Sequence, residues 1–347
     1  MARHKNLFLP EPKWTLGRIL RWLLGLLLLC VLAAGGWLAH FATKPLAVAV
    51  ENRQFSIEPR KSLRVVSEQL ARSGLVSNSW GFQILARLSS ASDDLKAGSY
   101  AVGERITPRQ LLKKIVRGEF TLASVQFIEG WTFKQIRETL DQHPAVRHEA
   151  RNMPVEKILE QLQIAEPSVE GWMFPDTYRF AAGTSDLTIL RQAHQKMTAL
   201  LAGAWEKRRP GLPLATPYDA LILASIVEKE TGRKDERELV ASVFINRLKR
   251  GMRLQTDPTV IYGLGSSFDG NLRRVDLQTD NRYNTYMRGG LPPTPIAMPG
   301  EASIKATLNP ASGNALYFVA RGDGGHQFSA SLVEHNRAVD KYQRNKR

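Results

Sequence analysis

Two carboxylates only two residues apart, Glu228 and Glu230, have surroundings that favour acid–base chemistry. The segment Thr216–Asp219 predicts the start of the helix that carries them. Its threonine can cap, its proline suits the first helical position, and its aspartate favours the positive end of the helix dipole. Gly232 predicts the end of the same helix. Both carboxylates therefore belong to its last turn.

Residues two apart on a helix point about 200° apart, so the two carboxylates have different neighbours. The residues one and two turns before Glu230 are apolar: Leu223, Ile226 and Val227. Those before Glu228 are smaller and partly polar: Leu221, Ala224 and Ser225. Apolar surroundings and the negative end of the helix dipole both favour a protonated carboxyl. We therefore predict that Glu230 is a general acid, with Glu228 as the reserve candidate.

A plainer interpretation stays open for this helix end. Both glutamates would then be solvated, and one would pair with Lys229 or Arg233. The polar segments that follow, Arg253–Gly263 and Tyr283–Tyr286, are rich in amides, hydroxyls and aromatic rings, the groups that bind sugars. They are equally compatible with a well-capped turn region.

Composition limits the other classes of function. Hydrophobic residues make up 43% of the 347 residues and charged residues 23%, which is typical of a globular chain with room for an anchor and two domains. The net charge of +15 suits an anionic partner or simply a solvated basic surface. The seven histidines are scattered, with no cysteine partners at metal-ligand spacing, and no phosphate-binding loop of the Walker type appears. We predict neither a metal nor a cofactor.

The segment from Trp22 to Ala39 carries no charge and has about the length of a membrane-spanning helix. Basic residues are more frequent before it than after it, which predicts a cytoplasmic N-terminus and an external remainder. A cleaved signal peptide and a buried soluble helix are the alternatives. The single cysteine, Cys30, follows two leucines rather than small residues, so we do not expect lipidation there.

The periodicity predicts an α+β chain built from successive parts. We expect residues 1–21 to form a cytoplasmic N-terminus, 22–41 a transmembrane helix, and 42–54 a linker and first strand. Residues 55–118 form a small α+β module, with predicted helices near 62–73, after Asn78 and over Thr107–Arg117. Residues 119–347 form a mixed α/β domain, with helices near 187–206 and 236–249 and a hairpin at 316–329.

Several long motifs occur in an order that resembles the endolytic murein transglycosylase, or YceG-like, family. They are Ala224–Thr231, Ala241–Leu248, Leu254–Gly263, Glu170–Gly171 with Phe174–Tyr178, Tyr283–Tyr286 and Gly290–Pro293. The resemblance covers nearly the whole chain after the apolar segment. It implies a LysM-like module at 55–118, a catalytic domain in the periplasm, and Glu230 at the position of the family's catalytic glutamate.

The resemblance also implies the reaction. The protein would cleave the β-1,4 bond between N-acetylmuramic acid and N-acetylglucosamine in nascent peptidoglycan strands, leave a 1,6-anhydro end, and so terminate glycan elongation. It would be a lyase of the inner membrane, with peptidoglycan synthases as possible partners and no nucleic acid. A hydrolysing muramidase and a non-catalytic glycan-binding anchor are the alternatives. We expect the following residues to bind substrate: Asn246, Gln255, Thr256, Asp257, Tyr283 and Asn284.

Overall fold

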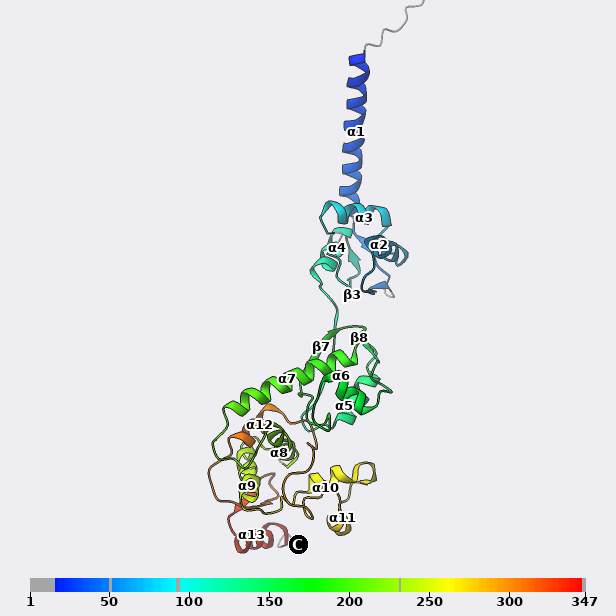
Figure 1. The fold of residues 1–347 in the computed structure, drawn as a ribbon. Helices are drawn as coiled ribbons and strands as arrows, with labels where there is room; N and C mark the ends of the chain where they lie inside the picture. The colour runs from blue at the N-terminus through cyan, green and yellow to red at the C-terminus, as the bar shows by residue number, and fades with distance from the viewer. Residues whose placement is uncertain (1–15, 50–51, 92–93, 231, 345–347) are drawn as a thin grey trace, which may run out of the picture. The chain divides into compact units, whose positions relative to one another are not determined.

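The computed structural model describes residues 16–49, 52–91, 94–230 and 232–344. The chain divides after Thr121 into two compact units. Among the described residues, one helix is long and apolar enough to cross a membrane, Ile19–Thr43, with a mean hydropathy of 2.2. The predicted combination of an apolar N-terminal helix with mixed helix and strand structure is confirmed (Figure 1). Most of the basic residues that precede the apolar segment lie outside the described residues.

The first unit surrounds two small antiparallel strand pairs with short helices. Strand β1 pairs with β4, and β2 pairs with β3. Its elements are α1 (Leu16–Thr43), β1 (Leu46–Ala47), β2 (Gln54–Ile57), α2 (Leu63–Arg72), α3 (Ser79–Leu88), β3 (Gly98–Ala101), β4 (Arg105–Ile106) and α4 (Pro108–Arg117). The three helices predicted in this module are confirmed, and Asn78 and Thr107 cap α3 and α4 as expected.

Residues 42–49 contain the predicted first strand, β1, but they are packed against the module rather than forming a free linker. Helix α1 continues to Thr43, and β1 follows almost at once and pairs with β4. The side chains of Phe41 and Ala42 are buried in the core of the first unit. This segment is therefore part of the folded module, because its apolar residues have a core to join.

The second unit begins with strands and short helices that precede a helical core. Its first elements are β5 (Leu122–Gln126), α5 (Phe133–Gln142), β6 (Val146–Arg147), α6 (Val155–Leu162), β7 (Thr177–Ala181), β8 (Thr184–Ser185) and α7 (Asp186–Glu206). Strand β5 is antiparallel to β7, and β6 is parallel to β8. These pairs form two small sheets, and the long α7 follows β8 directly.

The remaining elements form the helical core and the C-terminal hairpin. They are α8 (Pro217–Glu230), α9 (Arg237–Lys249), α10 (Asp257–Leu264), η2 (Gly265–Ser267), α11 (Arg274–Gln278), α12 (Glu301–Leu308), β9 (Tyr317–Ala320), β10 (His326–Ser329), α13 (Leu332–Val339) and η3 (Asp340–Arg344). Helix α8 is buried on all sides from Ala220 to Val227, between α7, α9, α10 and α12. A helix that is apolar all round belongs in a core, and its last turn lies where that core meets solvent, with only Lys229 fully exposed.

Candidate active site

Local sequence fixes the start of α8 and therefore the position of its last turn. Pro217 is the first residue of the helix. The backbone N–H of Asp219 donates to the Thr216 hydroxyl at 3.1 Å, and the Asp219 carboxylate accepts from the N–H groups of Ala215 and Thr216. This reciprocal cap satisfies backbone donors that a helix start leaves free. The predicted cap is confirmed, and the helix ends at Glu230.

The two carboxylates of the last turn have separate environments. The side chain of Glu228 is only 7% exposed, and its Oε2 accepts from the Gly300 N–H at 2.9 Å and from the Ser303 hydroxyl at 2.7 Å. Its Oε1 lies 3.7 Å from Nη2 of the buried Arg237. Glu228 thus joins α8 to the start of α12 and to α9. A Cβ at Gly300 would lie 1.9 Å from a carboxylate oxygen of the exposed Glu129, so a larger residue here would displace that side chain.

Glu230 is half-buried and lines a cleft of about 370 Å³. Its Oε1 accepts a hydrogen bond from the hydroxyl of Thr256. Burial raises the pKa of the Glu230 carboxyl and the nearby Asp257 raises it further, whereas the Thr256 hydrogen bond, His326 and Arg247 lower it. The net direction is upward, as the apolar stripe beneath Glu230 predicts. The carboxyl therefore tends to hold its proton.

A small hydroxyl network fixes Thr256 at the start of α10. The Thr256 N–H donates to the Thr285 hydroxyl at 3.1 Å, and the Thr259 hydroxyl donates to the Thr256 carbonyl at 2.7 Å. The hydroxyls of Thr259 and Thr285 are 2.9 Å apart, and all three threonines are buried. Thr256 is thus held from two sides, which fixes its hydroxyl against Glu230.

The residue before Thr256 adopts a left-handed backbone. Gln255 has a φ of +46°, and its N–H donates to the Thr285 carbonyl at 3.1 Å. Left-handed non-glycine residues are uncommon and cluster at functional sites. Gln255 is exposed and lines the same cleft. The strained turn thereby presents an amide beside the carboxyl of Glu230.

Polar groups from several elements line the cleft with Glu230. The Asp257 carboxylate accepts a hydrogen bond of 2.6 Å from the Tyr286 hydroxyl. The full lining is Glu230, Phe244, Arg247, Leu254, Gln255, Asp257, Tyr286, Phe318, Val319, Ala320, His326, His335, Val339 and Gln343. Of the residues predicted from sequence, the structure brings Glu230, Gln255, Thr256 and Asp257 together here.

Three predicted substrate-binding residues lie elsewhere in the second unit. The Asn246 amide donates to the carbonyls of Gly313 and Ala315, and the Tyr283 hydroxyl bonds that of Thr294 at 3.0 Å. Asn284 is fully buried and its amide donates to three carbonyls, those of Asp276, Leu277 and Thr279. None of the three lines the cleft around Glu230. Their side chains hold loops instead.

A histidine that the sequence analysis did not select lines the cleft on the hairpin of β9 and β10. The buried carboxylate of Glu236 accepts from the His326 backbone N–H at 3.0 Å and lies 2.7 Å from His326 Nδ1. Two bonds to one carboxylate fix the imidazole plane and place the Nδ1 proton toward Glu236. The two residues are ninety positions apart in the chain, so spacing could not pair them.

Arg247 was also missed, although it lies inside one of the motifs named above. It is buried, and its guanidinium donates to the carbonyls of Leu316 at 2.7 Å and Leu254 at 2.6 Å. It thereby joins α9 to the hairpin and to the segment before α10. The sequence signal that identifies it is an arginine at helical spacing with the apolar residues Val240, Val243 and Phe244.

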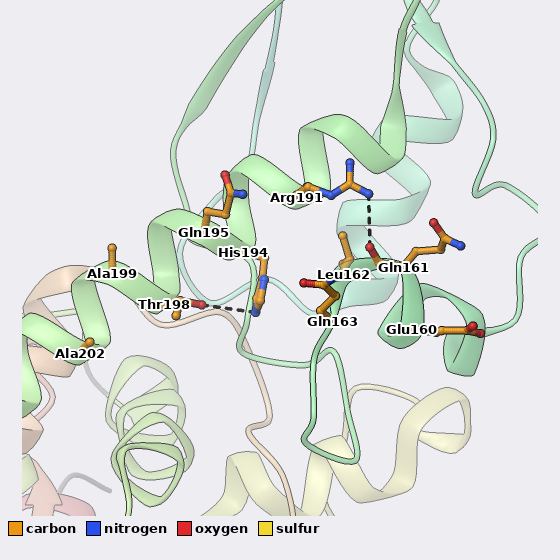
Figure 2. A pocket seen from close by; sticks show the side chains of 10 residues that line it. All are labelled: Glu160, Gln161, Leu162, Gln163, Arg191, His194, Gln195, Thr198, Ala199 and Ala202. Atoms are coloured by element: carbon orange, nitrogen blue, oxygen red, sulfur yellow. Dashed lines mark hydrogen bonds between the residues drawn. The ribbon is translucent and has the colours of Figure 1, made fainter.

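A larger cavity of about 840 Å³ lies between α6 and α7 (Figure 2). His194 and Thr198 of α7 are hydrogen-bonded there, and Arg191 donates to the Gln161 carbonyl of α6. Its one carboxylate, Glu160, is exposed and pairs with Lys157. A general acid needs a carboxyl that keeps its proton, so the smaller cleft is the better candidate.

One group among the described residues has the spacing of metal ligands. Asp141, His148 and Asp186 offer atoms within 4.8 Å of one another. The Asp186 carboxylate already accepts from the N–H groups of Glu149, Ala150 and Leu187 at the start of α7. These bonds give it a structural role apart from the cleft.

Glu170, from the Glu170–Gly171 motif, is a second perturbed carboxyl. It is buried and accepts from the Phe133 N–H at 2.9 Å and from the Tyr262 hydroxyl at 3.1 Å. It thereby joins α5 to α10. Burial raises the pKa of Glu170 to about 7, against the opposing effect of its hydrogen bonds. It does not line the cleft of Glu230, so its titration should affect stability first.

We expect Glu170→Gln to stabilise the protein at pH 8 and to matter much less at pH 5. A carboxyl whose pKa is higher in the folded state stabilises fully below its unfolded value, 4.5, and loses that contribution as pH rises through about 7. Glutamine keeps an acceptor for Phe133 and carries no charge. The effect of Glu170→Gln on the free energy of unfolding should be about 2 kcal/mol more favourable at pH 8 than at pH 5. Chemical denaturation at the two pH values measures it. Equal effects at both pH values would contradict it, and the exposed Glu238→Gln is the control.

Known proteins resemble this chain over most of its length. Residues 55–341 match a family described as YceG-like. The chain is 30% identical over 305 residues to an endolytic murein transglycosylase of Bacillus subtilis strain 168, covering 83% of this chain and 84% of that protein. It is 27% identical over 353 residues to one of Streptococcus pneumoniae serotype 2 strain D39, covering 90% of this chain and 63% of the relative. A crystal structure of a yceG-like protein from Listeria monocytogenes has a TM-score of 0.53 at 29% identity, covering 82% of this chain and 98% of that one.

Proposed function

The chain belongs to the YceG-like family, and we propose that it is a peptidoglycan lytic transglycosylase that uses Glu230 as its catalytic acid. Its substrate would be the β-1,4 bond between N-acetylmuramic acid and N-acetylglucosamine inside nascent strands, and its product a 1,6-anhydro end that terminates elongation. The observation that supports this most is a carboxyl of raised pKa in a polar cleft, held by Thr256.

In the proposed reaction, one carboxyl performs two proton transfers. Neutral Glu230 donates its proton to the glycosidic oxygen, the bond from this oxygen to C1 of the muramic ring breaks, and the glucosamine leaves with a free 4-hydroxyl. The C6 hydroxyl of the same muramic ring then attacks C1 and gives its proton to the Glu230 carboxylate. The acid is thus regenerated and no water is consumed. Because the nucleophile is internal, a second catalytic carboxylate, as in ordinary glycosidases, is not required.

The surrounding residues suit this scheme. The Thr256 hydroxyl engages Oε1 of Glu230, which favours placement of the acidic proton on Oε2. Gln255, Asp257 and Tyr286 supply amide, carboxylate and phenol groups for sugar hydroxyls. We propose that Asn246, Tyr283 and Asn284 influence substrate binding through the loops that they hold.

The apolar helix α1 supports a single-pass anchor in the inner membrane, and a peptidoglycan substrate requires the second unit to lie outside the cytoplasm. The excess of Lys and Arg before the span favours a cytoplasmic N-terminus. We propose that the module at 55–118 is LysM-like and contacts glycan, and that peptidoglycan synthases are partners because the proposed substrate is their product.

Product mass tests the proposed reaction. Wild-type protein incubated with defined, uncrosslinked glycan should release fragments that end in 1,6-anhydromuramic acid, which weigh one water less than hydrolytic fragments. Reducing ends without the anhydro product would identify a hydrolysing muramidase instead. Intact strands that bind the wild-type protein would favour a glycan-binding anchor. Either of these results would overturn the proposal.

A further inference from the structure

Helix α1 enters the first unit without a flexible joint. Its last turns contact α3 and α4, and Phe41 and Ala42 are buried there. Gly81 of α3 makes the approach possible, because a Cβ at this position would lie only 3.1 Å from the rings of Trp37 and Phe41. The Trp37 and Phe41 rings are stacked at 5.7 Å. The module is therefore fixed to the end of the apolar helix.

Helix α3 has a buried face and an apolar outward face. Phe82 and Ala86 lie in the core, whereas Trp80 is 62% exposed and Leu88 is 72% exposed. Ile84 lies between them at helical spacing, so Trp80, Ile84 and Leu88 share one face. We call these three residues the α3 outer face. Large apolar side chains grouped on a surface indicate an interaction site.

The position of the α3 outer face next to helix α1 indicates that it contacts the membrane surface. The Trp80 ring lies 6.1 Å from that of Trp37, which belongs to α1 itself. Trp22 is the first residue of the uncharged segment and Trp37 lies two residues before its end, about 22 Å further along the helix axis. Tryptophans concentrate at the two membrane–water interfaces. Trp37 at the outer interface would hold Trp80 at the same level.

The groups around this junction complete a lipid-binding surface. A cavity of about 310 Å³ lies between the end of α1 and the segment just before α3. It is lined by Trp37, His40, Phe41, Lys44, Leu46, Ser77 and Asn78. Lys44, directly after α1, and Arg87 of α3 are exposed. Basic side chains of this kind attract the phosphates of lipid headgroups. A membrane surface likewise presents apolar chains next to charged headgroups, so it can contact the aromatic rings and the basic side chains of this junction together.

We propose that the α3 outer face lies in the headgroup region of the bilayer that holds α1. This inference rests on the proposed membrane anchor and is independent of the cleavage chemistry. The end of the first unit that carries α3 then faces the lipid (Figure 1). The chain leaves the module from the β3 side, where the Thr121 N–H donates to the Ser99 carbonyl. The catalytic unit is thus tethered to a module of fixed height.

Site-specific fluorescence in nanodiscs tests this proposal with the full chain. The only cysteine, Cys30, is changed to serine, and an environment-sensitive label is attached to Trp80→Cys or Leu88→Cys. Lys61→Cys, on the exposed loop between β2 and α2 of the same module, is the matched control. Nanodiscs of phosphatidylethanolamine and phosphatidylglycerol contain a lipid with a quencher near the headgroup. We expect at least threefold quenching at positions 80 and 88, and little at position 61.

A third label tests separately whether α1 spans the bilayer, which is the premise of this proposal. Leu29→Cys, midway between Trp22 and Trp37 in α1, should be quenched by a lipid with a deep quencher if α1 is in the bilayer. If the label at position 29 is quenched while those at 80 and 88 are as insensitive as that at 61, the inference is overturned and the anchor is kept. Labels at 80 and 88 that are shielded from both lipid and aqueous quenchers would indicate a protein partner, which also overturns it. Two labelled positions guard against a local folding defect at either one.

Discussion

Glu230→Gln is expected to lower glycan cleavage by about 10³-fold, within the usual range for a lost general acid. An amide cannot deliver the proton that the glycosidic oxygen requires, although it keeps the size of the side chain and an acceptor for the Thr256 hydroxyl. The measurement is the initial rate of anhydro-product release, followed by liquid chromatography and mass spectrometry. Glu238→Gln, which removes an exposed carboxylate of α9 outside the cleft, should keep the wild-type rate.

Because the pKa of Glu230 is raised, both the cleavage rate and the stability of the protein should depend on pH. The wild-type rate should fall as pH rises through that pKa, because the acid form is lost. The same burial disfavours the folded state once the carboxyl ionises, so Glu230→Gln should be at least as stable as wild type at pH 8. A variant with wild-type rate would contradict the assignment. A variant that is inactive because it has unfolded would contradict the account of the site.

The sequence predicts local structure well wherever one short segment determines it. The start of α8, the caps of α3 and α4 and the hairpin of β9 and β10 are all confirmed. The direction of the Glu230 pKa also follows from its own helix, because the apolar residues beneath it are three, four and seven positions away. Each of these features depends on residues close together in the chain.

Features that depend on distant partners could not be predicted from spacing. Asn284 has the chemistry of a sugar ligand, yet its amide donates to three carbonyls at and just after the end of α11. His326 is oriented by Glu236, and Glu228 is bound by the start of α12 rather than by its neighbours Lys229 or Arg233. Sequence identifies which groups can do chemistry. The fold determines whether their hydrogen-bonding capacity is already used.

Glu228→Ala is expected to destabilise the second unit by about 3 to 5 kcal/mol, the usual cost of breaking a buried ion pair. It would remove the acceptor of the Gly300 N–H and the Ser303 hydroxyl, and leave the Arg237 guanidinium, only 8% exposed, without its carboxylate. Glu228→Gln retains one acceptor oxygen and should cost less, about 1 to 3 kcal/mol. Denaturant unfolding of the full chain in detergent, with Glu238→Gln as the control, measures both.

A double variant separates charge from packing at this helix end. Removal of both charges in Glu228→Gln/Arg237→Met should recover part of the stability lost in Glu228→Gln alone, because no buried cation is left unpaired. Activity per folded molecule should stay near that of wild type in Glu228→Gln, since Glu228 does not line the cleft. Two results together would contradict this assignment. Glu228→Gln would be fully stable but unable to cleave glycan, and Glu230→Gln would still cleave it. The two glutamates of one helical turn would then divide stability and catalysis in the opposite way.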